Sequence, residues 1–221
     1  MKTLLIASIV LFAPFVAAED EPTTNVHLLV TVIDEEDSSW DVEDRQTGTP
    51  ASADLGTLWL FGLAAQQTWG DVLQWGYEGG VLGTRKEDDT HFRDSTETLE
   101  ATIETRFTSV SGFLGGVVGV QPLSMLRLYA SAGPAVTWAY VDQDDDDDDD
   151  LGVPTLDIDL SEGNNDVTFA PYARAGLEIV FPNNFALGVS VHWTDGEFDF
   201  DEAGEVEYDD TMLVVTLGGR I

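Results

Sequence analysis

The sequence contains no cysteine among its 221 residues. This absence excludes disulfide scaffolds, thiolate zinc sites, cysteine nucleophiles and lipid anchors attached to cysteine. Positive charge is also scarce, because 9 Lys and Arg stand against 42 Asp and Glu, which gives a formal net charge of −33. Such a chain repels polyanions, so we exclude nucleic acid as a partner. A disordered acidic chain is excluded too, because 43% of the residues are hydrophobic and can bury the core of one domain.

The longest apolar run lies at the N-terminus. Lys2 supplies a positive charge, residues 4–16 are apolar apart from Ser8, and Val16-Ala17-Ala18 ends the run with small residues. This pattern predicts a signal peptide over residues 1–18, cleaved before Glu19, and therefore an exported protein. The run is too short for a membrane-spanning helix, which needs about 20 apolar residues. Residues 19–221 then form a single domain.

The rest of the chain shows alternation with a period of two residues, which is typical of strands with two different faces. In the segment Val167–Phe181, for example, Phe169, Leu177 and Ile179 share one face, while Arg174 and Glu178 share the other. We expect eight strands, over Val26–Ile33, Leu55–Ala65, Leu73–Gly83, Phe107–Val120, Leu126–Val141, Val167–Phe181, Phe185–Asp195 and Met212–Ile221.

The connections between these segments are of two kinds. Three are short turns, at Gln67–Asp71, Gln121–Met125 and Pro182–Asn184, and four are long and acidic, at Asp34–Asp54, Thr84–Arg106, Asp142–Asp166 and Gly196–Asp209. The two kinds alternate strictly, beginning with a long one. The pattern predicts an all-β, eight-stranded, antiparallel up-and-down transmembrane β-barrel, with the four acidic loops at one end and the three turns at the other. Both termini of the barrel then lie at the end with the short turns.

With these features the chain resembles the small eight-stranded outer-membrane β-barrels of Gram-negative bacteria, the porin-like outer-membrane protein β-barrel domain family. The resemblance covers nearly all of residues 26–221 and includes the signal peptide, the loop asymmetry and the segment Leu126-Arg127-Leu128-Tyr129-Ala130-Ser131-Ala132-Gly133. It implies a place in the outer membrane of the cell envelope, in contact with outer-membrane lipid and lipopolysaccharide. Family members usually end on an aromatic residue, whereas this chain ends on Ile221.

Two prolines lie inside expected strands, at Pro134 and Pro171. Each removes one hydrogen bond from the ladder, so we expect a β-bulge at both positions.

Aromatic residues fall near segment ends or on the outward face, as expected of the two aromatic girdles of a membrane barrel. They are Trp59, Trp75, Tyr77, Trp138, Tyr140 and Trp193.

The inward face carries charged residues. By alternation, Glu78, Arg127, Arg174, Glu178 and Arg220 point into the lumen, although the chain has so few basic residues. Buried guanidinium and carboxylate groups are costly unless they pair. We therefore predict an internal salt-bridge network that fills the barrel. A path for protons or ions through the lumen is the alternative.

The run Asp144–Asp150 consists of aspartate alone and cannot fold on itself, because adjacent carboxylates repel. We expect Asp142–Asp166 to be a mobile loop, with weak binding of Ca²⁺ or Mg²⁺ at Asp144, Asp146, Asp148 and Asp150. A dedicated EF-hand site is not predicted, because Leu151 and Ile158 replace the required oxygen ligands. An acidic surface adapted to salty surroundings is an alternative explanation. We predict no tightly bound cofactor or metal.

Catalysis is not predicted. His192-Trp193-Thr194, with Glu197 nearby, is the best match to the His/Ser/Glu set of outer-membrane lipid A deacylases. Thr replaces Ser there, and no oxyanion signal accompanies it. His27 and His91 lack companions at metal-ligand spacing.

The sequence thus predicts a non-enzymatic outer-membrane barrel with a structural or surface-interaction role, whose acidic loops attract divalent cations. One alternative is a narrow channel for small apolar or ionic solutes. The other is a soluble secreted β-barrel or β-sandwich that binds a small ligand, in which the apolar face would form the core.

Overall fold

The computed structural model describes residues 21–33, 38–43, 50–54, 57–94, 100–143, 164–200 and 204–221. The regular structure in these residues consists of ten β-strands: β1 (Thr23–Ile33), β2 (Ser38–Glu43), β3 (Pro50–Asp54), β4 (Leu58–Trp69), β5 (Leu73–Asp94), β6 (Glu100–Leu123), β7 (Leu126–Gln143), β8 (Asn164–Val180), β9 (Phe185–Phe200) and β10 (Gly204–Arg220). Within the described ranges, no helix is long and apolar enough to cross a membrane.

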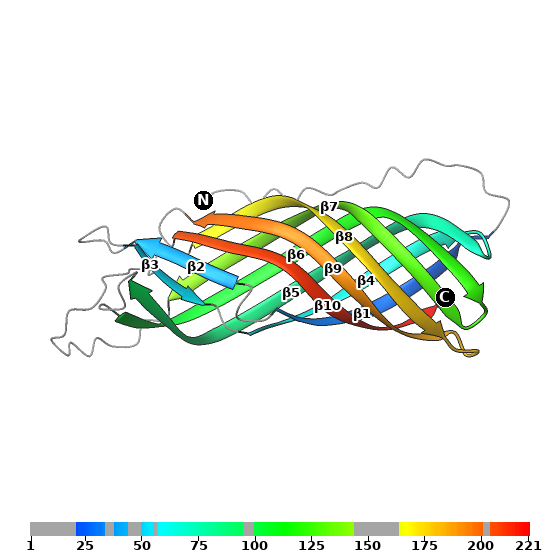
Figure 1. Ribbon diagram of the computed structural model, residues 1–221, viewed down its shortest axis with the longest axis horizontal. Coiled ribbons are helices and arrows are strands. Elements are labelled where there is room, and N and C mark those ends of the chain that lie inside the picture. Colours follow the sequence, from blue (N-terminus) through cyan, green and yellow to red (C-terminus); the bar gives the residue numbers. More distant parts are fainter. Residues whose placement is uncertain are drawn as a thin grey trace, which may run out of the picture.

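Eight of the strands close into an antiparallel barrel. β1 pairs with β4, each strand from β4 to β10 pairs with the next along the chain, and β1 also pairs with β10. The strands run obliquely along the long axis of the molecule (Figure 1). The backbone N–H of Ile221 donates to the carbonyl of Thr24 at 2.9 Å, so the chain's end meets the start of β1. The predicted eight-stranded antiparallel barrel is confirmed.

The first expected loop, Asp34–Asp54, contains a hairpin of its own. β2 pairs with β3, while β2 also pairs with β10 and β3 with β5, for example through Trp40↔Val206 and Ser52↔Arg93. Figure 1 shows β2 and β3 at the end opposite the C-terminus. The hairpin therefore continues the barrel wall beyond the ends of β1 and β4.

Several strands also extend well beyond the predicted segments. β5 reaches Asp94 and β6 begins at Glu100, so most of the expected loop Thr84–Arg106 is paired strand. β9 and β10 likewise occupy most of Gly196–Asp209. Their inward positions include the buried Thr90, Thr105 and Phe198. The acidic side chains in these segments obscured the alternation in the sequence.

The two prolines lie directly opposite one another, Pro134 on β7 and Pro171 on β8. The expected bulges are not formed, because the register is unchanged past both residues. The missing N–H groups coincide instead with interruptions in the pairing on the other side of each strand, where β7 meets β6 and β8 meets β9. The β6–β7 ladder skips the positions between Phe113↔Ala135 and Gly116↔Ala132, and described pairing of β8 with β9 ends at Tyr172↔Thr194. A register shift occurs elsewhere, between Val120 and Leu123.

The outward face is apolar and exposed, with Leu63 at 55% and Phe169 at 77% exposure. The inward face divides into two halves. Towards the short turns it is polar and charged, but towards the β2–β3 hairpin it is a buried apolar core of Leu29, Ile33, Trp40, Leu58, Leu60, Leu82, Phe107, Phe198, Phe200, Met212 and Val214, among others. The predicted salt-bridge network therefore does not fill the whole barrel, because aliphatic and aromatic side chains alternate inward in the outer half.

Aromatic side chains cluster at two levels of the outward face. Near the short turns Trp69 stacks on Trp75 with ring centroids 5.2 Å apart, and towards the other end Trp138 stacks on Tyr140 at 6.1 Å. Trp138 shares a cross-strand row with Gly83, which is eight residues beyond Trp75 on β5. At about 3.3 Å per residue and a tilt of about 40°, this places the levels roughly 20 Å apart, close to the apolar band of a membrane barrel.

Candidate functional site: the charged network in the lumen

Four charged side chains from three strands meet inside the barrel near its short-turn end. Glu78 lies on β5, Arg127 on β7, and Arg174 and Glu178 on β8; their exposures are 0%, 0%, 2% and 1%. Because successive residues of a strand face opposite sides, their parity places them in the lumen. Burial this complete requires each charge to have a partner.

Glu78 is the centre of the first group of contacts. Arg174 donates from Nη1 to Glu78 Oε2 at 3.1 Å and from Nε to Ser190 Oγ at 3.0 Å. Ser131 donates its hydroxyl to Glu78 Oε1 at 2.7 Å, and the side-chain amide of Gln66 donates to Glu78 Oε2. A single carboxylate thus binds donors from three other strands of the wall.

Glu178 is the centre of the second group. Arg127, directly opposite it on β7, donates from Nη1 to Glu178 Oε2 at 2.9 Å and from Nε to Gln74 Oε1 at 2.6 Å. His27 Nε2 lies 2.9 Å from Glu178 Oε1, without the alignment of a hydrogen bond. Arginine serves both groups well because its planar guanidinium donates in several directions at once.

Tyr129 joins the two groups. The guanidinium carbons of Arg127 and Arg174 lie 5.2 Å and 5.3 Å from the centroid of its ring. Both distances are within the range of cation–π attraction. The two ion pairs and the ring between them therefore form one continuous structure, which we call the lumen network.

Arg220 was predicted in the same network but lies at its rim. It is partly exposed, and it donates from Nη2 to Gln121 Oε1 at 3.3 Å. Gln74 donates to the same oxygen at 3.1 Å. Arg220 is thus joined to Arg127 through two side-chain amides, beside a polar cavity of about 420 Å³ at the mouth of the barrel.

Inward-facing glycines make room for the large side chains of the network. A Cβ on Gly115 would lie 2.5 Å from the Tyr172 hydroxyl, one on Gly176 would lie 2.9 Å from the Tyr129 ring, and one on Gly188 would lie 2.8 Å from Glu178 Cγ. Even an alanine would therefore displace these neighbours. This crowding explains why glycine stands at these three inward positions.

Sequence reasoning did not find the polar partners of the network: His27, Gln66, Gln74, Ser131 and Ser190. Each has the inward parity of its strand, so the alternation itself was the available signal. It could not show which inward side chains meet, because strands far apart in the sequence provide them.

Among the described side chains, His192 is packed against aromatic rings. The His192 ring stacks on Tyr172 with centroids 5.6 Å apart, and it meets Phe113 edge-on at 5.5 Å. The Thr194 hydroxyl is directed to the carbonyl of Pro171, at 3.5 Å. The side chain of Glu197 lies outside the described residues. The surroundings of His192 are thus those of a packed aromatic side chain.

Metal ligands do not converge in the described ranges, where no group of three or more His, Asp or Glu side chains is arranged to hold an ion. Asp144, Asp146, Asp148 and Asp150, named above for weak cation binding, lie outside the described residues.

Solved structures of outer-membrane proteins share this architecture. OprG from Pseudomonas aeruginosa is 14% identical to this chain, and the match has a TM-score of 0.58. It covers 91% of this chain and 97% of the OprG chain. Ail, the attachment invasion locus protein of Yersinia pestis, is 16% identical, and the match has a TM-score of 0.47. It covers 91% of this chain and 99% of the Ail chain. At 14% identity the likeness to OprG shows the fold alone.

The sequence comparisons place the chain in a family. A search of curated proteins finds no match. The profile of the outer membrane protein β-barrel domain, however, matches residues 3–220, which is nearly the whole chain. The protein therefore belongs to the outer membrane protein β-barrel domain family and is an integral barrel of the outer membrane.

Proposed function

We propose that this protein is a barrel closed to ions, with a structural or surface-interaction role that its acidic exterior serves. The observation that carries the proposal is the Glu78–Arg174 ion pair, which joins β5 to β8 across the lumen. An eight-stranded barrel is only wide enough for its interior to be filled by side chains or to hold one small ligand.

Two further features support a closed lumen. The network receives side chains from six strands, β1, β4, β5, β7, β8 and β9. Beyond it lies a largely apolar layer that contains Leu29, Leu82 and Val214, in which the buried polar groups include the neutral hydroxyls of Thr31 and Thr84. An ion would have to break buried pairs and then cross this apolar layer, and both steps are costly.

The acidic exterior supports the surface role. Most of the 42 carboxylates lie in the connections on the long-loop side, including the seven of Asp144–Asp150. Carboxylate oxygens are the ligands that Ca²⁺ and Mg²⁺ prefer. Divalent cations held there would bridge the protein to the phosphates of lipopolysaccharide, the anionic lipid of this membrane.

Conductance measurements test the closed lumen. Purified protein in planar bilayers should give no stable conductance steps in 1 M KCl, while a water-filled porin in the same bilayers serves as the positive control. A variant with Glu78→Ala and Arg174→Ala would remove the central pair and test whether the pair is the barrier. Stable steps from the wild-type protein would overturn the closed lumen.

Vesicle binding tests the surface role. Protein in liposomes should bind vesicles that contain lipid A when Ca²⁺ is present, and should release them when EDTA is added. Replacing Asp144–Asp150 by seven asparagines keeps the length and polarity of the segment but removes its charge. Binding that does not change with Ca²⁺ or with this replacement would contradict cation bridging.

A second function is favoured by one observation, the end of β8–β9 pairing at Tyr172↔Thr194. β8 continues to Asn164 and β9 to Phe200, but beyond this pair the two strands are not paired with each other beside the apolar outer half of the lumen. Phe169, exposed at 77%, lies next to this interruption. Small apolar solutes could pass from the exterior through the outer lumen into the membrane at this position.

A disulfide lock tests this second function. In the β8–β9 register, Pro171 and Asp195 would be the next pair, and the chain has no cysteine of its own. Cells that carry Pro171→Cys with Asp195→Cys should take up a small apolar dye more slowly when oxidised than when reduced. Equal uptake in both states, with the disulfide formed, would rule out this route.

A further inference from the structure

In the part of the chain that the structure describes, the basic side chains outside the lumen network and its rim gather on one hairpin. Arg85, Lys86 and Arg93 lie on β5, and Arg106 lies on β6. Arg106 is held between two carboxylates, with its Nε 3.0 Å from Glu87 and its Nη1 3.8 Å from Asp142. Arg85 differs, because it is 65% exposed and its contact with Glu87 is long, at 3.5 Å. Arg85 is therefore an accessible cation on a strongly acidic protein, and on β5 it is the exposed arginine nearer to the short turns, since Arg93 lies eight residues further out.

Arg85 lies at the level of the outer aromatic residues. It pairs with Thr108 on β6, which pairs in turn with Tyr140 on β7. The next row towards the short turns contains Trp138, which stacks on Tyr140. Aromatic girdles mark the depth of the lipid headgroups, and the long-loop side of such barrels faces the exterior. Arg85 is thus placed among the headgroups of the outer leaflet.

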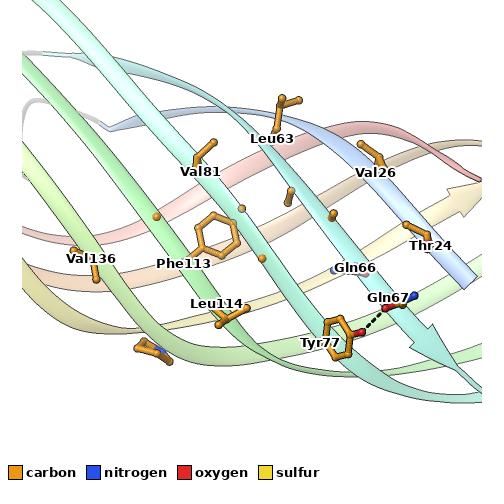
Figure 2. Close-up of a pocket in the computed structure, with 16 residues that line it drawn as sticks. Thr24, Val26, Leu63, Gln66, Gln67, Tyr77, Val81, Phe113, Leu114 and Val136 are labelled. Atoms are coloured by element: carbon orange, nitrogen blue, oxygen red, sulfur yellow. Dashed lines mark hydrogen bonds between the residues drawn. The ribbon is translucent and has the colours of Figure 1, made fainter. Parts of the chain in front are cut away.

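An apolar groove of about 830 Å³ begins a short distance below Arg85 on the same strands. Its lining includes Leu63, Val81 and Val136 at the outer end and the hydrogen-bonded pair Tyr77 and Gln67 at the inner end (Figure 2). Val81 is four residues from Arg85, or about 13 Å along the strand. The volume is within the range of small-molecule sites, about 300–1,000 Å³.

Glycines create the depth of this groove. Gly79 and Gly112, both among its lining residues, have outward parity on β5 and β6. A Cβ on Gly112 would meet its nearest neighbour, the Val136 carbonyl, at 4.0 Å, so the space above it is open. The groove lies on the surface that faces lipid, where an acyl chain is the natural apolar occupant.

Charge decides between two occupants of the groove, a second copy of this chain and an anionic lipid. A second copy would bring its own net charge of −33 towards an equally acidic exterior, and like charges in contact are unfavourable. A lipid with a phosphate headgroup instead places its negative charge on Arg85 and its chain in the groove below. Basic groups at headgroup level attract anionic lipids in this way.

We propose that the outward face of β5 and β6 binds one lipopolysaccharide molecule, with a lipid A phosphate on Arg85 and an acyl chain in the groove over Gly79 and Gly112. This inference rests on the proposed function, since it names the site where the surface contacts anionic lipid. It adds a direct contact that needs no bridging cation.

Native mass spectrometry of the protein extracted from outer membranes in mild detergent tests the site. The extract is washed with EDTA, so that lipopolysaccharide held by divalent cations is removed and directly bound lipid remains. The wild-type barrel should keep one lipopolysaccharide adduct, and Arg85→Gln should lower the adduct fraction about five-fold, the effect of losing one basic group at the headgroups. Gly112→Leu should lower it similarly by filling the groove.

Each variant has a matched control. Arg93→Gln removes the same charge eight residues further from the groove on β5. Gly116→Leu adds the same side chain to an outward position of β6 that is not part of the groove lining and has nothing within 4 Å of an added Cβ. Both controls should keep the adduct.

Three outcomes would overturn the proposal. Equal adducts in all five proteins would show that Arg85 and the groove do not hold the lipid. Adducts with phospholipid masses would assign the face to another lipid. A doubled protein mass that Gly112→Leu abolishes would make the groove an interface between copies. Conductance and calcium-dependent vesicle binding measure the proposed function separately, so its failure is distinguishable from failure of the lipid site.

Discussion

The two halves of the lumen are built from the same strands by the same alternation, yet their chemistry is opposite. Near the short turns, Arg127, Arg174, Glu78 and Glu178 pair around Tyr129. Further out, leucine, phenylalanine and tryptophan side chains pack in the manner of a soluble protein's core. The alternation along each strand thus determines which residues are inside. The side chains at each level determine whether ion pairs or apolar packing stabilise that part of the interior.

The largest expected effect is in the charged half. Arg174→Ala leaves Glu78, which is 0% exposed, without its guanidinium partner. Breaking a buried ion pair in this way costs about 3–5 kcal/mol. Urea unfolding in detergent micelles, followed by gel mobility without boiling, should show the barrel unfolding at clearly lower urea.

A double variant separates the lost pair from a loss of packing. Arg174→Met together with Glu78→Leu removes both charges and keeps comparable volume, and such replacements are often neutral or stabilising. The double variant should therefore recover most of the lost stability. If it were as unstable as Arg174→Ala, packing alone would explain the first result.

The apolar half should respond to lost volume. Leu82 is 2% exposed and is part of the outer core. Leu82→Ala should cost about 2–4 kcal/mol, because it removes buried methyl groups and leaves a cavity. Leu63, 55% exposed on the outward face, is the control, and Leu63→Ala should cost clearly less in the same urea titration. Equal costs would contradict the assignment of inner and outer faces.

Two neighbouring glycines on β6 compare the crowded interior with the open exterior. An added Cβ at Gly115 would lie 2.2 Å from the Ala132 carbonyl, whereas at Gly116 it would meet nothing within 4 Å. Gly115→Ala should therefore destabilise by about 1–3 kcal/mol through overpacking. Gly116→Ala should leave the unfolding midpoint unchanged, and a reversed order would place the two residues on the wrong faces.

The smallest effect is expected at an exposed ion pair in the outer extension. The hydrogen bond and charge of Arg106, followed by those of Arg85, hold the pKa of Glu87 below its ordinary value. A carboxyl with a lowered pKa stabilises the fold above its unfolded pKa, and this contribution is lost as the pH falls through the folded pKa. Glu87→Gln should therefore be slightly less stable than wild type at pH 7, and the difference should shrink as the pH falls below the ordinary carboxyl range. A difference that grew on acidification would show the opposite sign of coupling.

The sequence was sufficient for the eight strands of the barrel and their inner and outer faces, because alternation is a local property of each segment. It also indicated that Glu78, Arg127, Arg174 and Glu178 point inward. It could not indicate that Arg174 meets Glu78 and not Glu178. That choice depends on side-chain rotamers and on the packing of two strands whose paired residues are 96 positions apart in the sequence.

The ends of the strands were the least predictable part. Acidic residues such as Glu87 and Asp142 suggested loops, although in a strand beyond the membrane the outward positions face water and tolerate charge. The prolines were misjudged for a related reason. Their missing donors are accommodated at interruptions of neighbouring ladders, between β6 and β7 and at the end of β8–β9 pairing, without a change of register.

The hairpin of β2 and β3 has a consequence for engineering. Because it pairs with β10 on one side and β5 on the other, it replaces β1 and β4 in the outer wall and leaves the circumference unchanged. A peptide graft in a surface loop leaves the fold intact only where the loop is not itself part of the barrel wall. Here a graft that separates β2 from β3 would break the hydrogen bonds between these two strands of the barrel wall. It would expose two strand edges, which are sites for aggregation.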